Sequence, residues 1–294
     1  MSILVCIPAF NEEKIIGRVV KDCLRYSNKV VVCDDGSSDK TYEEAELAGA
    51  TCLKHKKNLG KGAALKSLFN FAKNSDFEII VTIDGDGQFL PEEIPKLVKP
   101  IEENTADIVI GYRFDDASEM PNYRKVGNKI LNKMTNLASE LPTNDSQSGY
   151  RAYSKKAIEK IEFNLDGFGS DSEILIDASR KKFRISEERV KVIYDTGMKT
   201  STKNPISHSG EVITSLLEII AVKSPLKFIG IPGTILMFLG IIFAVNVVTV
   251  FNETRYFSIP YTMVGITFLV IGSMLLLMSV LLFSISKIAY KIRD

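Results

Sequence analysis

The sequence predicts an α/β domain with a mostly parallel sheet, followed by a hairpin of two transmembrane helices. Short apolar runs alternate with helical patterns over roughly the first third of the chain, which is typical of a sheet covered by helices on both faces. Charged residues then become rare, because residues 228–286 contain only Glu253 and Arg255. We expect a globular domain over 1–208, a juxtamembrane amphipathic helix over 209–225 and a membrane hairpin over 226–290.

Five apolar runs are expected to form the strands. They cover residues 3–7, 30–33, 51–54, 78–83 and 107–110. Helical patterns separate them near residues 13–26, 40–48, 61–73 and 92–103. This order favours parallel pairing, and ligands of such sheets bind at the carboxyl ends of the strands.

Polar, glycine-rich motifs follow four of the expected strands. They lie at residues 8–12, 34–39, 58–62 and 84–88. One such motif is a weak signal, because turns favour glycine and aspartate in any protein. The carboxyl ends of parallel strands share one edge of a sheet, so four motifs together predict a binding site at that edge.

The motif after the fourth strand carries the clearest chemistry. Asp84 and Asp86 stand one residue apart on a tight turn. Two such carboxylates can hold a hard divalent cation through oxygen, and a cation with an open side suits the diphosphate of a nucleotide. A helix–loop–helix calcium site is excluded, because the positions that need glycine and glutamate are Phe89 and Pro95.

Several other classes lack their sequence signals. No GxGxxG follows the first strand and no GxxxxGK[ST] occurs, so neither a dinucleotide oxidoreductase nor a P-loop enzyme is expected. The net charge of +1 predicts no nucleic-acid partner. Four cysteines without metal-binding spacing predict reduced thiols, buried at Cys6 and Cys33. They are Cys6, Cys23, Cys33 and Cys52.

Two apolar stretches, about 226–250 and 259–286, each exceed the roughly 20 residues that cross a bilayer as a helix. Basic residues flank both outer ends of the pair, which places those ends on the cytoplasmic side. They are Lys223, Lys227, Lys287, Lys291 and Arg293. We therefore expect a multi-pass protein of the cell membrane whose globular domain and C-terminus are cytoplasmic. The apolar spacing from Val212 to Ile220 fits a helix on the membrane surface or one packed on the globular domain.

Taken together, these motifs resemble glycosyltransferase family 2, whose catalytic domain has the GT-A fold. The resemblance rests on PAFNE at 8–12, DDGSSD at 34–39, NLGKG at 58–62, DGDGQ at 84–88, IGYR at 110–113, RKVGNKILN at 124–132 and SGYRAYS at 148–154. The later segments are similar to the branch that makes polyprenyl-phosphate sugars, the dolichyl-phosphate mannose and glucose synthases.

The resemblance implies roles for individual residues. It implies a nucleotide-sugar donor site made by Pro8, Phe10, Glu12, Asp35, Lys61, Asp84, Gly85 and Asp86. It implies that Asp84, Asp86 and Gln88 hold Mg²⁺ or Mn²⁺ against the donor diphosphate. It implies an acceptor-phosphate site made by Arg113, Arg124, Ser148 and Arg151, and a catalytic set made by Asp86, Arg113 and Arg124.

The activity that this resemblance implies is an inverting transfer of one hexose to a dolichyl or undecaprenyl phosphate. A phosphate monoester has a second pKa of about 6, so it is mostly dianionic at pH 7 and needs positioning rather than a general base. Phe89 replaces the histidine usual after Gln88, and residues 196–205 lack the arginine common in mannose synthases. These departures favour UDP-glucose or UDP-N-acetylglucosamine over GDP-mannose.

Other interpretations stay open at the level of sequence. A non-catalytic nucleotide-sugar-binding scaffold is one, and a polysaccharide synthase is another, although such synthases usually carry a QxxRW segment and this chain has no Trp. Asp171 and Glu173 either contact the donor sugar, orient basic residues or simply open a helix. The stretch 54–57, which includes His55, is expected to be a solvated loop, and a homo-oligomer is compatible with all of these features.

Overall fold

A computed structural model provides the structure of this chain. It describes residues 1–113, 132, 133, 135, 136, 139, 141–163, 170–193 and 225–293, with side chains up to residue 285. The chain divides into two compact units, Met1–Leu216 and Leu217–Asp294. The expected boundary at 208 and the expected helix over 209–225, apart from residue 225 itself, lie outside the described residues and stay predictions.

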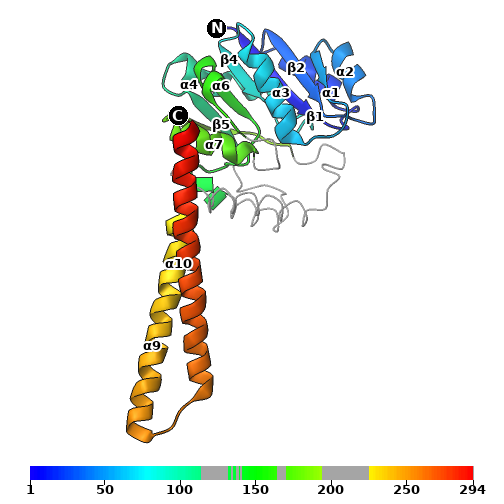
Figure 1. The fold of residues 1–294 in the computed structure, drawn as a ribbon. Coiled ribbons are helices and arrows are strands. Elements are labelled where there is room, and N and C mark those ends of the chain that lie inside the picture. Colours follow the sequence, from blue (N-terminus) through cyan, green and yellow to red (C-terminus); the bar gives the residue numbers. More distant parts are fainter. Residues whose placement is uncertain are drawn as a thin grey trace. The chain divides into compact units, whose positions relative to one another are not determined.

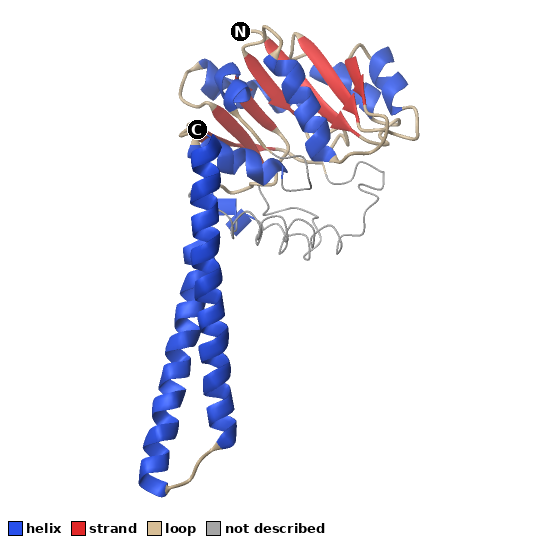
Figure 2. Ribbon diagram, viewed as in Figure 1, coloured by secondary structure: helices blue, strands red, loops and turns tan. Residues whose placement is uncertain are grey.

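The first unit is built on a seven-stranded sheet with the order β3-β2-β1-β4-β6-β5-β7 (Figures 1 and 2). Its strands are β1 (Ile3–Ala9), β2 (Lys29–Asp34), β3 (Thr51–Lys54), β4 (Ile79–Thr82), β5 (Ile108–Arg113), β6 (Arg151–Ser154) and β7 (Ile185–Val190). All neighbours pair in parallel except β6, which is antiparallel to both β4 and β5. The mostly parallel sheet and its five expected strands are confirmed, while β6 and β7 were not anticipated.

Helices cover both faces of this sheet. Those described in the first unit are α1 (Ile16–Cys23), α2 (Thr41–Leu47), α3 (Lys61–Lys73), the 3₁₀ helix η1 (Pro91–Glu93), α4 (Ile94–Glu102), α6 (Lys155–Lys160) and α7 (Ser170–Arg180). In β1, Val5 and Ile7 join a core cluster with α1 and α4, whereas Leu4 and Cys6 join one with α3, α6 and α7. A strand buried on both faces reads as a continuous apolar run, which explains why β1 was recognisable in the sequence.

Strand register brings the loops of the site to one edge. The last residues of β1 and β2, Ala9 and Asp34, pair directly, and Thr82 at the end of β4 pairs with Arg151 at the start of β6. Because β6 runs antiparallel, the segment before it reaches the carboxyl ends of β4 and β5. The expected thiols are also confirmed: Cys6 and Cys33 are buried and unpaired.

The second unit is a pair of long helices, the single π turn η2 (Leu226–Gly230) continuing into α9 (Ile231–Thr254), and α10 (Ile259–Arg293) (Figure 1). Leu226–Thr254 and Ile259–Ile285 are long and apolar enough to cross a membrane, with mean hydropathies of 2.5 and 2.6. These two helices correspond to the expected hairpin.

Glycines allow α9 and α10 to approach closely. A Cβ added to Gly240 would lie 2.7 Å from Leu269 Cγ, and one added to Gly272 would lie 2.6 Å from the Met237 backbone nitrogen. Small residues at such contacts are typical of helix pairs in membranes, where van der Waals packing replaces the hydrophobic effect.

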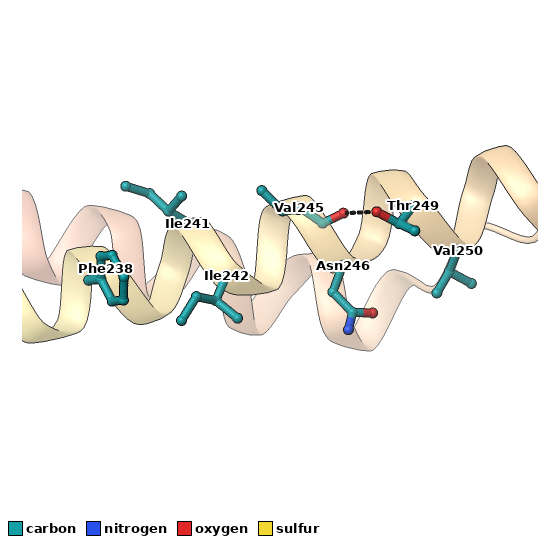
Figure 3. Close-up of a pocket in the computed structure, with 7 residues that line it drawn as sticks. All are labelled: Phe238, Ile241, Ile242, Val245, Asn246, Thr249 and Val250. Carbon is teal, nitrogen blue, oxygen red and sulfur yellow. Dashed lines mark hydrogen bonds between the residues drawn. The ribbon is translucent and has the colours of Figure 1, made fainter.

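One exposed face of α9 is shown in Figure 3. Shallow space on this face is lined by Phe238, Ile241, Ile242, Val245, Asn246, Thr249 and Val250. The Thr249 hydroxyl donates a hydrogen bond of 3.0 Å to the Val245 carbonyl, so its polarity is satisfied within the helix. This face is otherwise apolar apart from the Asn246 amide, as suits a surface in contact with lipid.

Candidate active site

The loops after β1 and β2 are locked together by side chain–backbone hydrogen bonds. Asn11 adopts a left-handed conformation with φ of 58°, and its side-chain oxygen accepts from the Ser38 backbone nitrogen at 2.9 Å. The Asn11 backbone nitrogen in turn donates to Ser37 Oγ at 2.9 Å. The Thr41 hydroxyl accepts from the Glu12 backbone nitrogen at 2.7 Å, so the sequence-predicted Glu12 sits on a fixed backbone.

Gly36 lets the second loop pack against the third. Its φ is +71°, and an added Cβ would lie only 2.4 Å from the Lys57 carbonyl carbon. Side chains are excluded at such a distance, because the neighbouring atom is backbone and cannot rotate away. The loops after β2 and β3 are therefore in direct backbone contact at the edge of the sheet.

Asp35, predicted to meet the nucleobase, holds the third loop. The residue is nearly buried, with 3% of its surface exposed. Its Oδ1 accepts from His55 Nδ1 at 2.6 Å and from the Leu59 backbone nitrogen at 3.0 Å. Its Oδ2 accepts from the Gly60 backbone nitrogen at 2.7 Å. Sequence reasoning anticipated the position of Asp35 but not its link to His55, which is largely buried rather than solvated.

The turn of residues 84–88 lies against a lysine from α3. Lys61 Nζ is 2.8 Å from Asp84 Oδ1 and 3.3 Å from Asp171 Oδ2. Burial disfavours the charged ammonium, but the Asp171 and Asp84 carboxylates outweigh that effect and raise the pKa of Lys61 above its usual value. Of the roles that the sequence left open for Asp171, this contact supports orientation of a basic residue, and the place of Asp171 in the first turn of α7 also confirms that it opens a helix.

Gly149 provides the space for this charged cluster. A Cβ at Gly149 would lie 2.6 Å from Lys61 Nζ and within 2.8 Å of both Asp84 carboxylate oxygens. Its own carbonyl accepts from the Thr82 hydroxyl at 2.8 Å. In the sequence, Gly149 is simply part of a family motif. The fold shows that a side chain at this position would occupy the space of the Lys61–Asp84 pair.

The turn at residues 84–88 is shaped by two glycines. Gly85 packs closely beneath the first loop, because an added Cβ would lie 3.2 Å from the Pro8 carbonyl oxygen. Gly87 has a φ of +70°, and an added Cβ would clash with Ile15, since it would lie 2.7 Å from Ile15 Cδ1. Pro8 near the end of β1 and Phe10 just after it, both expected at the donor site, are half-buried at the same edge.

Negative charge accumulates around this turn. Burial, followed by the nearby Asp84 charge, raises the pKa of Asp86 to about 6. Burial, followed by the charges of Asp86, Asp39 and Asp84, raises the pKa of Glu12 to about 7. Carboxylates that resist ionisation in this way favour a nearby cation, which would relieve their repulsion.

This donor set fits a hard divalent ion. Within the described part of the chain no three His, Cys, Asp or Glu side chains gather into a metal site. The expected ligands, the carboxylates of Asp84 and Asp86 with Gln88, stay a prediction of the resemblance. Asp86 Oδ1 also accepts from the Gln88 backbone nitrogen at 3.0 Å, which fixes the turn. Two carboxylates leave room for phosphate and water oxygens, as Mg²⁺ prefers.

The expected acceptor residues fall into three groups. Arg113 donates two side-chain hydrogen bonds to Asp145, from Nε at 2.6 Å and from Nη2 at 2.9 Å. Ser148 and Arg151 are fully buried. Arg151 donates to the carbonyls of Asp171 and Ser146, and Ser148 donates to that of Gly111.

In this structure Ser148 and Arg151 are buried and donate to neighbouring carbonyls, and their expected contact with the acceptor phosphate stays a prediction. Arg124 lies outside the described residues, so its position stays a prediction. Asp145, which sequence reasoning missed, carried no signal beyond its acidic side chain, because its partner is 32 residues away in the chain.

Phe89 departs from the family pattern without entering the site. It is 3% exposed, and its ring centroid is 5.1 Å from that of Tyr150. The Tyr150 hydroxyl donates to the Leu90 carbonyl at 3.1 Å, which fixes this aromatic pair beneath the turn. The substitution thus changes core packing behind the metal motif, and it gives little reason to exclude any particular donor sugar.

A mostly parallel sheet with an Asp-x-Asp turn at its carboxyl edge defines the class of protein, a glycosyltransferase with the GT-A fold. The family described as Glycosyl transferase family 2 matches residues 4–162. The chain therefore belongs to glycosyl transferase family 2.

Named relatives include transferases that act on dolichyl phosphate. The chain is 34% identical over 215 residues to the UDP-N-acetylglucosamine–dolichyl-phosphate N-acetylglucosaminyltransferase of Methanococcus voltae, covering 65% of this chain and 86% of that protein. It is 31% identical over 192 residues to the dolichol-phosphate mannosyltransferase of Pyrococcus furiosus, covering 62% and 54%.

A solved structure supports the fold. Glucosyl-3-phosphoglycerate synthase from Mycobacterium tuberculosis, crystallised with Mn²⁺, UDP and phosphoglyceric acid, matches with a TM-score of 0.58 at 22% identity. The match covers 74% of this chain and 78% of that one. At this level of identity the likeness concerns the fold alone.

Proposed function

We propose that this protein transfers one hexose from a nucleotide-sugar to a polyprenyl phosphate at the membrane. The observation that carries the proposal is the charged cluster at the sheet edge. There Asp84 lies beside Lys61, Asp86 stands two residues further along the same turn, and Arg113 ends strand β5. The chain continues from this family 2 domain into two helices long enough to cross a bilayer, which suits an acceptor that is itself a lipid.

The donor side of the site would bind the diphosphate through charge. Asp84, Asp86 and Gln88 would hold Mg²⁺ or Mn²⁺, which when bound supplies Lewis-acid neutralisation of the leaving diphosphate. Lys61 is held in its charged form by two carboxylates, and it adds positive charge to the same region. Asp84 and Asp171 fix the direction of that ammonium, so little reorganisation is needed when a diphosphate arrives.

The nucleobase would meet Asp35. A carboxylate accepts hydrogen bonds, so its partner must offer an N–H group. Uracil and guanine offer a ring N–H, and adenine and cytosine offer an exocyclic amino N–H, so a contact with Asp35 does not by itself select the base. The resemblance to polyprenyl-phosphate sugar synthases, rather than this contact, is what favours UDP- or GDP-linked donors. Among these we favour UDP-N-acetylglucosamine or UDP-glucose, in line with the name of the Methanococcus voltae relative.

The acceptor phosphate would act as its own nucleophile. One of its oxygens forms a bond to the anomeric carbon as the bond from that carbon to the nucleotide diphosphate breaks, so the nucleotide diphosphate leaves and the configuration inverts. A largely dianionic phosphate needs no general base. Arg113 and Arg124 would screen its charge and hold it in line, since guanidinium groups bind phosphate through paired hydrogen bonds.

Asp145 gives the Arg113 guanidinium a fixed orientation before the lipid binds. Two hydrogen bonds to one carboxylate restrict rotation of the planar group. We further propose that the globular domain and the C-terminus face the cytoplasm, because basic residues flank both outer ends of the helical hairpin.

One assay tests the proposal directly. Purified full-length protein is mixed with Mg²⁺ or Mn²⁺, a short polyprenyl phosphate and a panel of labelled UDP- and GDP-sugars. A single sugar should appear on the lipid phosphate, with little transfer when free phosphate replaces the lipid. Turnover of a nucleotide-sugar onto water or onto a growing glycan, with no lipid product, would contradict the proposal.

A further inference from the structure

His55 joins three parts of the site edge. It follows β3 directly, and its backbone nitrogen donates to the Asp34 carbonyl at 2.9 Å. Its Nδ1 is 2.6 Å from Asp35 Oδ1, and its Nε2 is 2.8 Å from Ser67 Oγ on α3. The imidazole is only 13% exposed, although its neighbours Lys54 and Lys56 are exposed.

These contacts define how the ring is used. Asp35 can only accept as a carboxylate, so Nδ1 of His55 carries a proton and donates it. The Ser67 hydroxyl can either donate to Nε2 or accept from it, and this second bond fixes the plane of the ring. Because both ring nitrogens are held, the hydrogen bond from His55 to Asp35 has a fixed direction. It orients the Asp35 carboxylate, as a supporting hydrogen bond orients a side chain that binds a metal.

The remaining contacts of Asp35 show what this arrangement leaves for a ligand. Oδ1 already accepts two hydrogen bonds, from His55 and from the Leu59 backbone. Within the described residues Oδ2 accepts one, from the Gly60 backbone. A carboxylate oxygen has two lone pairs, so Oδ2 retains one acceptor position.

We propose that His55 is a positioning residue for the donor nucleotide, fixing Asp35 so that Oδ2 can accept an N–H of the nucleobase. The inference rests on the proposed function, since it assumes that a nucleotide binds at this edge. It adds a residue that acts through Asp35 and touches neither the diphosphate nor the lipid. Loss of His55 should therefore weaken nucleotide binding without slowing the chemical step.

Two substitutions separate the hydrogen bond that His55 donates to Asp35 from the space that its ring fills. In His55→Asn the amide nitrogen takes the place of Nδ1 and can still donate to Asp35. In His55→Gln the longer side chain reaches towards Ser67, and its nitrogen takes the place of Nε2 instead. Lys56→Ala is the matched control, because Lys56 is the exposed neighbour in the same loop.

Binding of UDP and of GDP, each with Mg²⁺, is measured by calorimetry on the full-length protein in detergent. His55→Gln should raise the dissociation constant by about 10-fold or more, the effect of losing one hydrogen bond to a charged group. His55→Asn and Lys56→Ala should stay close to the wild type. In steady state, the Gln variant should show a raised KM for the donor with little change in kcat or in the KM for the lipid.

The outcomes are distinct. Equal weakening by Asn and Gln would overturn the inference, because it would mean that the ring serves only as packing. A raised KM for the lipid, or a lowered kcat with donor binding intact, would also overturn it. A wild-type protein that binds neither UDP nor GDP would instead overturn the proposed function, whatever the variants do. Thermal melting of each variant identifies effects that come from unfolding.

Discussion

Lys61 Nζ lies 2.8 Å from Asp84 Oδ1, and this pair occupies space that Gly149 leaves empty. The three residues come from α3, from the turn after β4 and from the segment before β6. Their meeting point therefore depends on the antiparallel placement of β6 beside β4. A half-buried positive charge beside the carboxylates of this turn is suited to a site that binds a diphosphate.

Gly149→Ala should disable the site while leaving the fold intact. The new Cβ would lie under 3 Å from Lys61 Nζ and both Asp84 carboxylate oxygens, and these are side-chain ends that can move away. Displacing catalytic groups by about 1 Å costs on the order of 100-fold in rate, so turnover should fall to that extent with little change in melting temperature. Gly17→Ala, whose Cβ would find its nearest neighbour at 3.5 Å, should retain activity. Equal activity in the two variants would contradict this account of the cluster.

Asp86→Asn should abolish most turnover and weaken metal binding. The change removes one of two carboxylates from the turn, and loss of one preorganised charged group costs on the order of 100-fold or more in rate. Manganese binding, followed by paramagnetic resonance in the presence of UDP, measures the loss directly. Asp22→Asn is the control, because Asp22, on α1 and away from the turn, forms a surface ion pair with Arg25. Full activity of Asp86→Asn after chelation would exclude a metal role for this turn.

Arg113→Ala should weaken use of the lipid far more than binding of the donor. Losing a charge-assisted phosphate contact should raise the KM for the lipid by roughly 10- to 150-fold. Arg113→Lys should restore only part of the affinity for the lipid phosphate, because lysine lacks the paired hydrogen-bond donors of arginine. The double variant Arg113→Ala/Asp145→Asn removes the carboxylate charge left without its partner and should show the same change in KM. A rise in the donor KM alone would reassign Arg113 to the diphosphate.

Asp107 predicts a pH-dependent term in stability. A side-chain hydrogen bond from Arg184 is the main cause that lowers the pKa of Asp107, with Nε at 3.1 Å from the carboxylate. A lowered folded pKa contributes stability that is complete above the unfolded value of about 3.9 and disappears as the pH falls through the folded value. Asp107→Asn should therefore lower the melting temperature at pH 7, with a difference that shrinks below about pH 4. A difference that stays constant with pH would show that the charge is irrelevant.

The hairpin predicts that its loop and the C-terminus lie on opposite sides of the membrane. Single cysteines at Ser258 and Asp294 should react with an impermeant reagent from opposite sides of sealed vesicles. Cys6, Cys23 and Cys33 are buried, so a Cys52→Ser background should remove most native labelling. Reaction of both sites from one side would contradict the hairpin topology.

The sequence alone determined where the strands up to β5 lie along the chain and which polar motifs follow them, because these depend on local signals. Buried parallel strands read as short apolar runs, and glycines at Gly36 and Gly87 mark turns whose backbone excludes other residues. The two membrane helices could also be predicted from the sequence, since a helix that crosses a bilayer requires a long uncharged stretch.

The tertiary structure decided which side chains reach solvent and which meet each other. Arg151 and Ser148 look like phosphate ligands in a motif, yet β6 and the segment before it hold both in the interior, where they donate hydrogen bonds to carbonyl oxygens. His55 looks solvated beside three lysines, yet Asp35 and Ser67 draw it inward. Such pairings join residues far apart in the chain, so no local pattern encodes them. They depend on the register of the sheet, which is fixed only when the whole core packs.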